Sequence, residues 1–239
     1  MTGDVFLRVP LATASNLLTT VSASANIYGK SRFNDINASL STGPELLRGR
    51  SRIRPQLLVG KRWFGGDGYS TSYGGWLNWR RQLDRSSQAE LDLILLHYDY
   101  DRNDGLDGRL ASSALHYERA LSPRLFGRLG LRVDRQQARD PAYATWTVGG
   151  DFLLSREIGR QFFFGQLSYY HISADAAFRL PPARRDDDLV EAAAGVLLRS
   201  LSFKGLAPAI RVRWTHSKSP VFFYDYSRLR AEISLTRDF

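Results

Sequence analysis

The sequence SRLRAEISLTRDF, residues 227–239, alternates apolar and polar residues almost to the end of the chain. Side chains that alternate in this way lie on opposite faces of an extended strand. The apolar face would carry Leu229, Ala231, Ile233 and Leu235. The polar face would carry Arg228, Arg230, Glu232, Ser234 and Thr236. A soluble sheet with one face on a core and an outer-membrane barrel with one face on lipid both fit this strand.

The same alternation recurs along the whole chain and favours the barrel. About thirteen alternating segments of about ten to fifteen residues are joined by alternately short and long connections, and this strand length suits a tilted membrane-spanning strand. In residues 89–95 a leucine stripe lies opposite Glu90 and Asp92. The pattern predicts an all-β transmembrane antiparallel up-and-down β-barrel of 12–14 strands, in one domain over residues 1–239.

The turn signals set the expected segment boundaries. The first segment is expected at residues 5–11, the second at 17–29 and the third at 33–42, where Gly43-Pro44 should end it. The run Gly65-Gly66-Asp67-Gly68 predicts a tight hairpin turn. The longest polar insertion is expected at residues 175–188.

Composition and charge exclude several classes of protein. The absence of cysteine excludes disulfides and thiol chemistry, and there is no apolar run long enough for a helical membrane span. The net charge of +9 comes from 29 arginines and only 4 lysines. These arginines are spread singly along the strands, so we expect no nucleic-acid partner. The start MTGDVFLRVP does not resemble a signal peptide, so we expect a fragment, a mature form or a gene start placed too late.

Arginines on the polar faces are the candidate functional residues. A charge facing lipid costs about 2–4 kcal/mol at the bilayer midplane, so the lumen is the cheaper position. These side chains would form salt-bridge ladders that stiffen the wall, or would guide an anionic or unfolded client. The candidate lumen-facing residues are Arg128, Arg132, Arg211, Arg213, Arg228, Arg230 and Glu232.

The sequence gives little support for catalysis or metal binding. The four histidines are His97, His116, His171 and His216, and only His97 has an acidic neighbour within two positions, Asp99. There is no Gly-x-Ser-x-Gly or His-Glu-x-x-His motif. The run Asp186-Asp187-Asp188 could bind a cation but fits a solvated loop better. We therefore expect no enzyme, no catalytic residue, no metal and no cofactor.

The last 35 residues resemble a known family. Gly205-Leu206-Ala207-Pro208, then Tyr224, Tyr226 and Arg228 after Ser217 or Ser219, then Thr236-Arg237-Asp238-Phe239 are similar to the end of the barrel domain of the surface lipoprotein assembly modulators, the Slam proteins. Leu206 stands where that family usually has an aromatic residue. The resemblance implies a fourteen-strand outer-membrane barrel that moves lipoproteins or related clients to the cell surface. It also implies an amino-terminal periplasmic domain of helical repeats, which this sequence does not include.

The function that follows is a transport barrel of the bacterial outer membrane. The resemblance implies that a client lipoprotein enters from the periplasm and that its acyl anchor leaves between the first and last strands. The alternatives are a passive arginine-lined porin and a soluble β-sandwich binding module. The expected partners are outer-membrane lipids, the barrel assembly machinery and a surface lipoprotein client. The expected assembly signal is Ala231, Ile233, Leu235, Arg237 and Phe239, with Arg237 where that machinery usually finds an aromatic residue.

Overall fold

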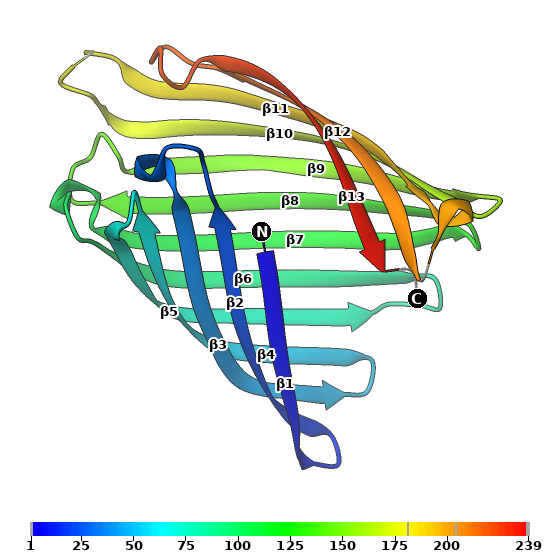
Figure 1. The fold of residues 1–239 in the computed structure, drawn as a ribbon. Helices are drawn as coiled ribbons and strands as arrows, with labels where there is room; N and C mark the ends of the chain where they lie inside the picture. The colour runs from blue at the N-terminus through cyan, green and yellow to red at the C-terminus, as the bar shows by residue number, and fades with distance from the viewer. Residues whose placement is uncertain (1, 181, 204, 238–239) are drawn as a thin grey trace. The chain divides into compact units, whose positions relative to one another are not determined.

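The computed structural model describes residues 2–180, 182–203 and 205–237, and almost all of them form β-strands. Thirteen strands form one sheet in which the spatial order is the chain order (Figure 1). This confirms the all-β antiparallel up-and-down arrangement, with thirteen strands in the described residues. No helix in these residues is long and apolar enough to cross a membrane. The strands are β1 (Thr2–Ala12), β2 (Ser15–Asn26), β3 (Asp35–Arg48), β4 (Ser51–Phe64), β5 (Asp67–Gln82), β6 (Ser87–Tyr100), β7 (Gly108–Ser122), β8 (Leu125–Ala138), β9 (Thr145–Ile158), β10 (Gln161–Ala177), β11 (Arg184–Leu198), β12 (Leu206–Lys218) and β13 (Tyr226–Arg237).

The chain divides into two compact units, which are described separately below. Unit 1 comprises Met1–Gln82, Glu90–Ala114 and Asp134–Trp146, and unit 2 comprises Leu83–Ala89, Leu115–Val133 and Thr147–Phe239. The described parts of the connections contain three short 3-10 helices: η1 (Ser31–Phe33), η2 (Asp104–Leu106) and η3 (Arg199–Leu201). Short and long connections alternate along most of the chain, as expected for a meander of paired hairpins.

Burial in the strands is inverted relative to a soluble protein. Large apolar side chains are exposed, such as Leu57 at 71% and Ile233 at 80%, whereas Glu45 and Asp187 are fully buried. The buried hydrophobic residues of the described chain are small: Ala142, Ala144, Ala174, Ala207 and Val221. A water-soluble sandwich buries its large apolar side chains between two sheets, so this distribution argues against that alternative. An exposed apolar surface of this kind requires a partner or a lipid environment.

The third strand is longer than the turn signals predicted. The expected break at Gly43-Pro44 is wrong, because β3 continues to Arg48. Residues 43–45 stay paired with β2, through Leu18↔Gly43 and Leu17↔Pro44 among other pairs. On the other side of β3, the pairs with β4 pass from Thr42↔Leu57 directly to Leu46↔Ile53. The strand accommodates proline, which has no backbone N–H, because the β2 pairing is maintained through this gap.

Two other segment boundaries also differ from those that the sequence predicted. The predicted polar insertion at 175–188 is shorter, because β10 extends to Ala177 and β11 begins at Arg184, where the two residues pair. The acidic run therefore lies in a strand and not in a loop. The turn at 65–68 is reduced to two residues, since β5 already begins at Asp67. Both Gly65 (φ 66°) and Gly66 (φ 94°) have positive φ values, which favour glycine in a two-residue hairpin turn.

The connection between β5 and β6 depends on one carboxylate. Asp84 accepts hydrogen bonds from the Ser86 amide (2.7 Å), the Ser86 hydroxyl (2.9 Å) and the Ser87 hydroxyl (2.7 Å). The hydrogen bond from Ser87, together with those from Ser86, lowers the pKa of the Asp84 carboxyl to about 2. A lowered pKa means that the charged form is the one that the folded turn stabilises.

We expect the ordering of this turn to persist above pH 4 and to be lost as the pH falls through about 2. The chemical shift of the Ser86 amide proton, followed by NMR, should report this midpoint. The substitution D84N removes the ionisable group and should abolish the transition. A titration midpoint near pH 4 would show that the hydrogen bonds of the turn do not stabilise the charged carboxylate.

Candidate functional site

In unit 1 the polar face of the sheet is organised around Glu45. Its carboxylate is fully buried and forms ion pairs with Arg8 of β1 and Arg54 of β4. The Nε of Arg54 donates a 2.5 Å hydrogen bond, and the side-chain amide of Asn16 donates at 3.3 Å. Four adjacent strands are therefore joined through one carboxylate. Buried charges in proteins are nearly always paired in this way, because an unpaired one is costly.

A second network continues this face on β5 and β6. Asn78 is almost fully buried and donates to Glu90 at 2.6 Å and to Asp92 at 2.9 Å. The indole of Trp76 donates to Asp92 at 2.7 Å, and Arg80 donates to Glu90 at 2.5 Å and 3.1 Å. The acidic pair that the sequence placed opposite the leucine stripe is thus fully engaged. In unit 1 the charges largely neutralise one another and connect neighbouring strands.

In unit 2 a smaller group lies on β7, β8 and β9. Arg128 donates to Asp151 at 3.0 Å, and the imidazole of His116 lies 3.7 Å from the same carboxylate. Gly130 leaves the space for this group, because a Cβ there would clash with both Asp151 and His116. Arg132 lies on β8 four residues after Arg128, on the same face, and is exposed.

The last two strands carry a row of charged side chains on one face. The register pairs Arg211 with Glu232, Arg213 with Arg230 and Thr215 with Arg228, so these side chains share one face of β12 and β13. Arg228, Arg230 and Glu232 are exposed, and an ion pair of 3.4 Å joins Arg230 to Glu232. On the neighbouring strand Glu191 accepts a hydrogen bond from Thr215 at 3.2 Å. Four arginines against two glutamates leave this surface positively charged.

The structure places all the predicted lumen-facing residues on polar faces. It places Ala231, Ile233 and Leu235 on the opposite, apolar face of β13, next to Val212, Ile210 and Pro208 of β12. Arg237 ends β13 and pairs with Leu206. Phe239, the last residue of the predicted assembly signal, lies outside the described residues. The structure therefore shows which face of β13 carries Ala231, Ile233 and Leu235, and the roles as lumen lining and assembly signal remain predictions.

The histidine partners differ from those that the sequence suggested. His97 packs against Tyr73 with ring centroids 5.1 Å apart and ring planes tilted by 48°, and the described residues show no hydrogen bond or ion pair between His97 and Asp99. His171 instead lies 3.1 Å from Asp186 and 3.2 Å from Asp188, both on the adjacent strand. These pairs follow from strand register, which sequence proximity does not show.

The acidic run is split between two faces of β11. Asp187 is fully buried and accepts a 2.5 Å hydrogen bond from Arg185, whose guanidinium lies 4.0 Å from the Tyr224 ring centroid. Asp186 and Asp188 point to the other face, towards His171. Within the described residues, no group of three or more histidine, cysteine or acidic side chains is arranged to hold a metal ion. The polar face thus provides fixed charges and hydrogen bonds.

An antiparallel meander with exposed apolar stripes on one face and a charged, partly buried opposite face defines a protein of the outer-membrane β type. The family model for surface lipoprotein assembly modifiers matches residues 7–239, and the chain belongs to this family. The resemblance seen in the last 35 residues is thereby confirmed over nearly the whole sequence.

Other comparisons add little to this assignment. None of the curated proteins matches the chain. A solved structure described as a bacterial polysaccharide outer membrane secretin is similar over 100% of this chain and 96% of its own, with 12% identity and a TM-score of 0.43.

Proposed function

We propose that this chain is the barrel of an outer-membrane transporter that brings lipoproteins to the cell surface. The observation that carries the proposal is the inverted burial of the strands in a member of the surface lipoprotein assembly modifier family. Exposed leucines, isoleucines and valines suit contact with acyl chains, and a charged opposite face suits a water-filled interior. A closed sheet would satisfy every backbone hydrogen bond in the membrane.

The two kinds of charged surface support different parts of this activity. The buried networks around Glu45 and Glu90 hold neighbouring strands together and leave little charge for a client. The arginines of β13 are exposed, and the arginines of β12 and β13 together outnumber the acidic residues beside them, so they would attract the carboxylates of an unfolded or partly folded client. The acyl anchor would remain on the apolar side and leave between the first and last strands.

Surface display of a reporter lipoprotein tests the proposal. Cells that carry the gene, together with any periplasmic domain encoded with it, should expose the reporter to added protease, and cells with the gene deleted should retain it inside. Heat-modifiable mobility of the purified protein in detergent would show that a barrel has formed. Unchanged reporter display after deletion would contradict the transport function.

The arginine-lined surface also favours a second function, a passive channel for anions. The relevant observation is the cross-strand pair of like charges, Arg213 and Arg230, which leaves positive charge uncompensated. Steady ohmic conductance with anion selectivity in planar bilayers, without any effect of the gene on reporter display, would favour the channel over the transporter.

The double substitution R228Q/R230Q should reduce the rate of reporter display about fivefold, because it removes two accessible charges that attract the client. The matched control is R160Q/R179Q, which removes two exposed arginines from connections of the same unit. Display measured in proteoliposomes at increasing salt should show the difference between wild type and R228Q/R230Q shrinking. Equal losses in both double variants would show that only net charge matters.

A further inference from the structure

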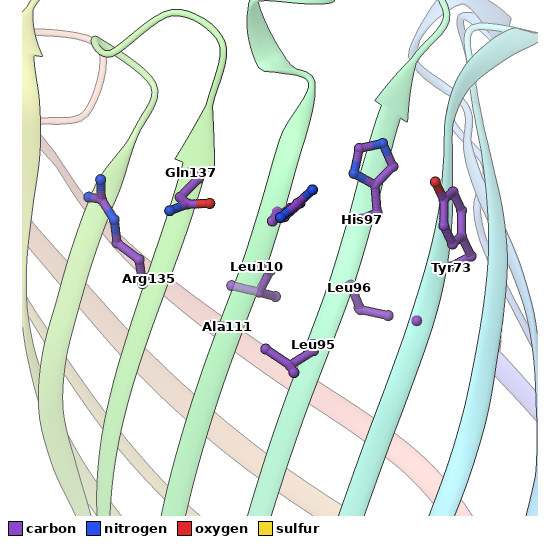
Figure 2. Close-up of a pocket in the computed structure, with 10 residues that line it drawn as sticks. Tyr73, Leu95, Leu96, His97, Leu110, Ala111, Arg135 and Gln137 are labelled. Atoms are coloured by element: carbon purple, nitrogen blue, oxygen red, sulfur yellow. The ribbon is translucent and has the colours of Figure 1, made fainter.

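A pocket of about 400 Å³ lies on the face of unit 1 that carries the exposed apolar residues (Figure 2). Tyr73 of β5, His97 of β6, and Arg135 and Gln137 of β8 line it in a row. His97, Arg135 and Gln137 lie near the ends of their strands, whereas Tyr73 lies in the middle of β5. Arg109, the second residue of β7, completes this polar row. The pocket is thus bordered by five side chains that can donate hydrogen bonds.

The other side of the pocket is apolar. Leu95, which is 66% exposed, lies on the same face of β6 as His97, and Ala111 lies on the same face of β7 as Arg109. Both apolar residues lie further from the strand end than their polar neighbours. The same face of β6 continues with Leu93 and Leu91. A ligand in this pocket would therefore meet cations at one end and a hydrocarbon surface at the other.

The two arginines lie on otherwise largely apolar faces, near the ends of β7 and β8. Arg109 is exposed and has no ion-pair partner among the described residues. The Arg135 guanidinium lies 5.2 Å from the ring centroid of Trp146, which fixes its position beside the pocket. A lipid-facing charge is most costly at the bilayer midplane and costs little near the interface. These arginines, close to the connections 101–107 and 139–144, therefore lie at the level of lipid headgroups.

We propose that this pocket binds an anionic lipid, whose headgroup phosphate carries a net negative charge that no cation in the same headgroup compensates. The phosphate would accept hydrogen bonds from Arg109 and Arg135, whose planar guanidinium groups match phosphate oxygens. His97, Gln137 and the Tyr73 hydroxyl would supply further donors, and the acyl chains would lie over Leu95 and Ala111. The inference rests on the membrane orientation of the proposed function, in which longer connections lie at the outer surface.

Native mass spectrometry of the purified protein in detergent tests the site. The probes are dioleoylphosphatidic acid, dioleoylphosphatidylcholine with the same chains, and sn-glycerol 3-phosphate without chains. The wild type should bind phosphatidic acid about tenfold more tightly than phosphatidylcholine, and glycerol phosphate far more weakly than either lipid. R109Q/R135Q should lower the preference to about twofold or less, and R109Q alone should lower it about threefold.

The control variant R119Q/R156Q also removes two exposed arginines from strands, one from β7 and one from β9, and should keep the full preference. Heat-modifiable mobility identifies any variant that fails to fold, and the single variant R109Q then decides the result. A preference that R109Q/R135Q leaves unchanged, an equal loss in the control, or equally tight binding of glycerol phosphate would overturn the lipid site. The assay contains no client, so its outcome is independent of reporter display.

Discussion

Replacing Glu45 by alanine is expected to lower the free energy of unfolding by about 3 kcal/mol or more. Glu45 is fully buried and is paired with both Arg8 and Arg54, and the side chain of Arg54 is itself only 21% exposed. Removing the carboxylate leaves a largely buried guanidinium without its counter-charge. The loss should exceed that of any exposed ion pair in unit 1, because desolvated charges gain most from a partner.

Urea-induced unfolding in lipid vesicles, followed by tryptophan fluorescence, measures this effect. The matched control is D67A, because Asp67 forms a 2.7 Å ion pair with Arg102 in which the two side chains are 58% and 69% exposed. Exposed pairs contribute only about 0–1 kcal/mol, so D67A should be close to neutral. Similar losses for E45A and D67A would show that the polar face is hydrated throughout and that Glu45 has no special role.

The importance of Glu45 could not be predicted from the sequence. Its partners lie 37 residues before it and 9 residues after it, and they meet only through the pairing of β1, β2, β3 and β4. The sequence shows which face a side chain takes, because alternation has a period of two. It does not show which residue of the next strand lies opposite, because register depends on turns and bulges.

The same distinction explains the remaining successes and errors. The two faces of β13 were predictable, since alternation there is almost unbroken, and the polar faces of Arg128 and Arg211 follow in the same way. The continuation of β3 past Pro44 could not be predicted from the sequence. Proline normally ends a strand, but here the backbone pairing with β2 is maintained on both sides of it. The partners of His171 were missed because Asp186 and Asp188 reach it only through the β10–β11 register.

The lipid-facing pocket was also hidden from the sequence. Arg109 and Arg135 are ordinary members of an arginine-rich chain, and Arg119 interrupts the same face of β7 as Arg109 does. Their significance arises because β7 and β8 bring them to one pocket with His97 and Tyr73. A cationic group on the apolar side would hold the wall at a fixed depth in the bilayer, while the arginines on β12 and β13 act on the polar side. Substitutions in the pocket and substitutions on the polar face of β12 and β13 can therefore be tested separately.

The substitution G74A is expected to destabilise the protein by about 3 kcal/mol. A Cβ at residue 74 would lie well inside the van der Waals radius of the Leu95 carbonyl oxygen and 2.9 Å from the Leu96 Cα. Both are backbone atoms of β6, so a rotamer change cannot relieve the clash and the two strands must separate. Overpacking of this kind costs about 1–3 kcal/mol in ordinary cores, and displacement of a ladder carbonyl places this site at the upper end.

The neighbouring residue provides the control, because Gly75 points to the opposite face of the same strand. A Cβ there would meet only the Gln56 carbonyl oxygen at 3.6 Å, an ordinary contact distance. G75A should therefore be neutral or stabilising by about 0.5 kcal/mol, since alanine loses less backbone entropy than glycine in a strand. Urea unfolding of both variants measures the difference. Equal stability of G74A and G75A would mean that β5 and β6 are not as close at Gly74 as the structure places them.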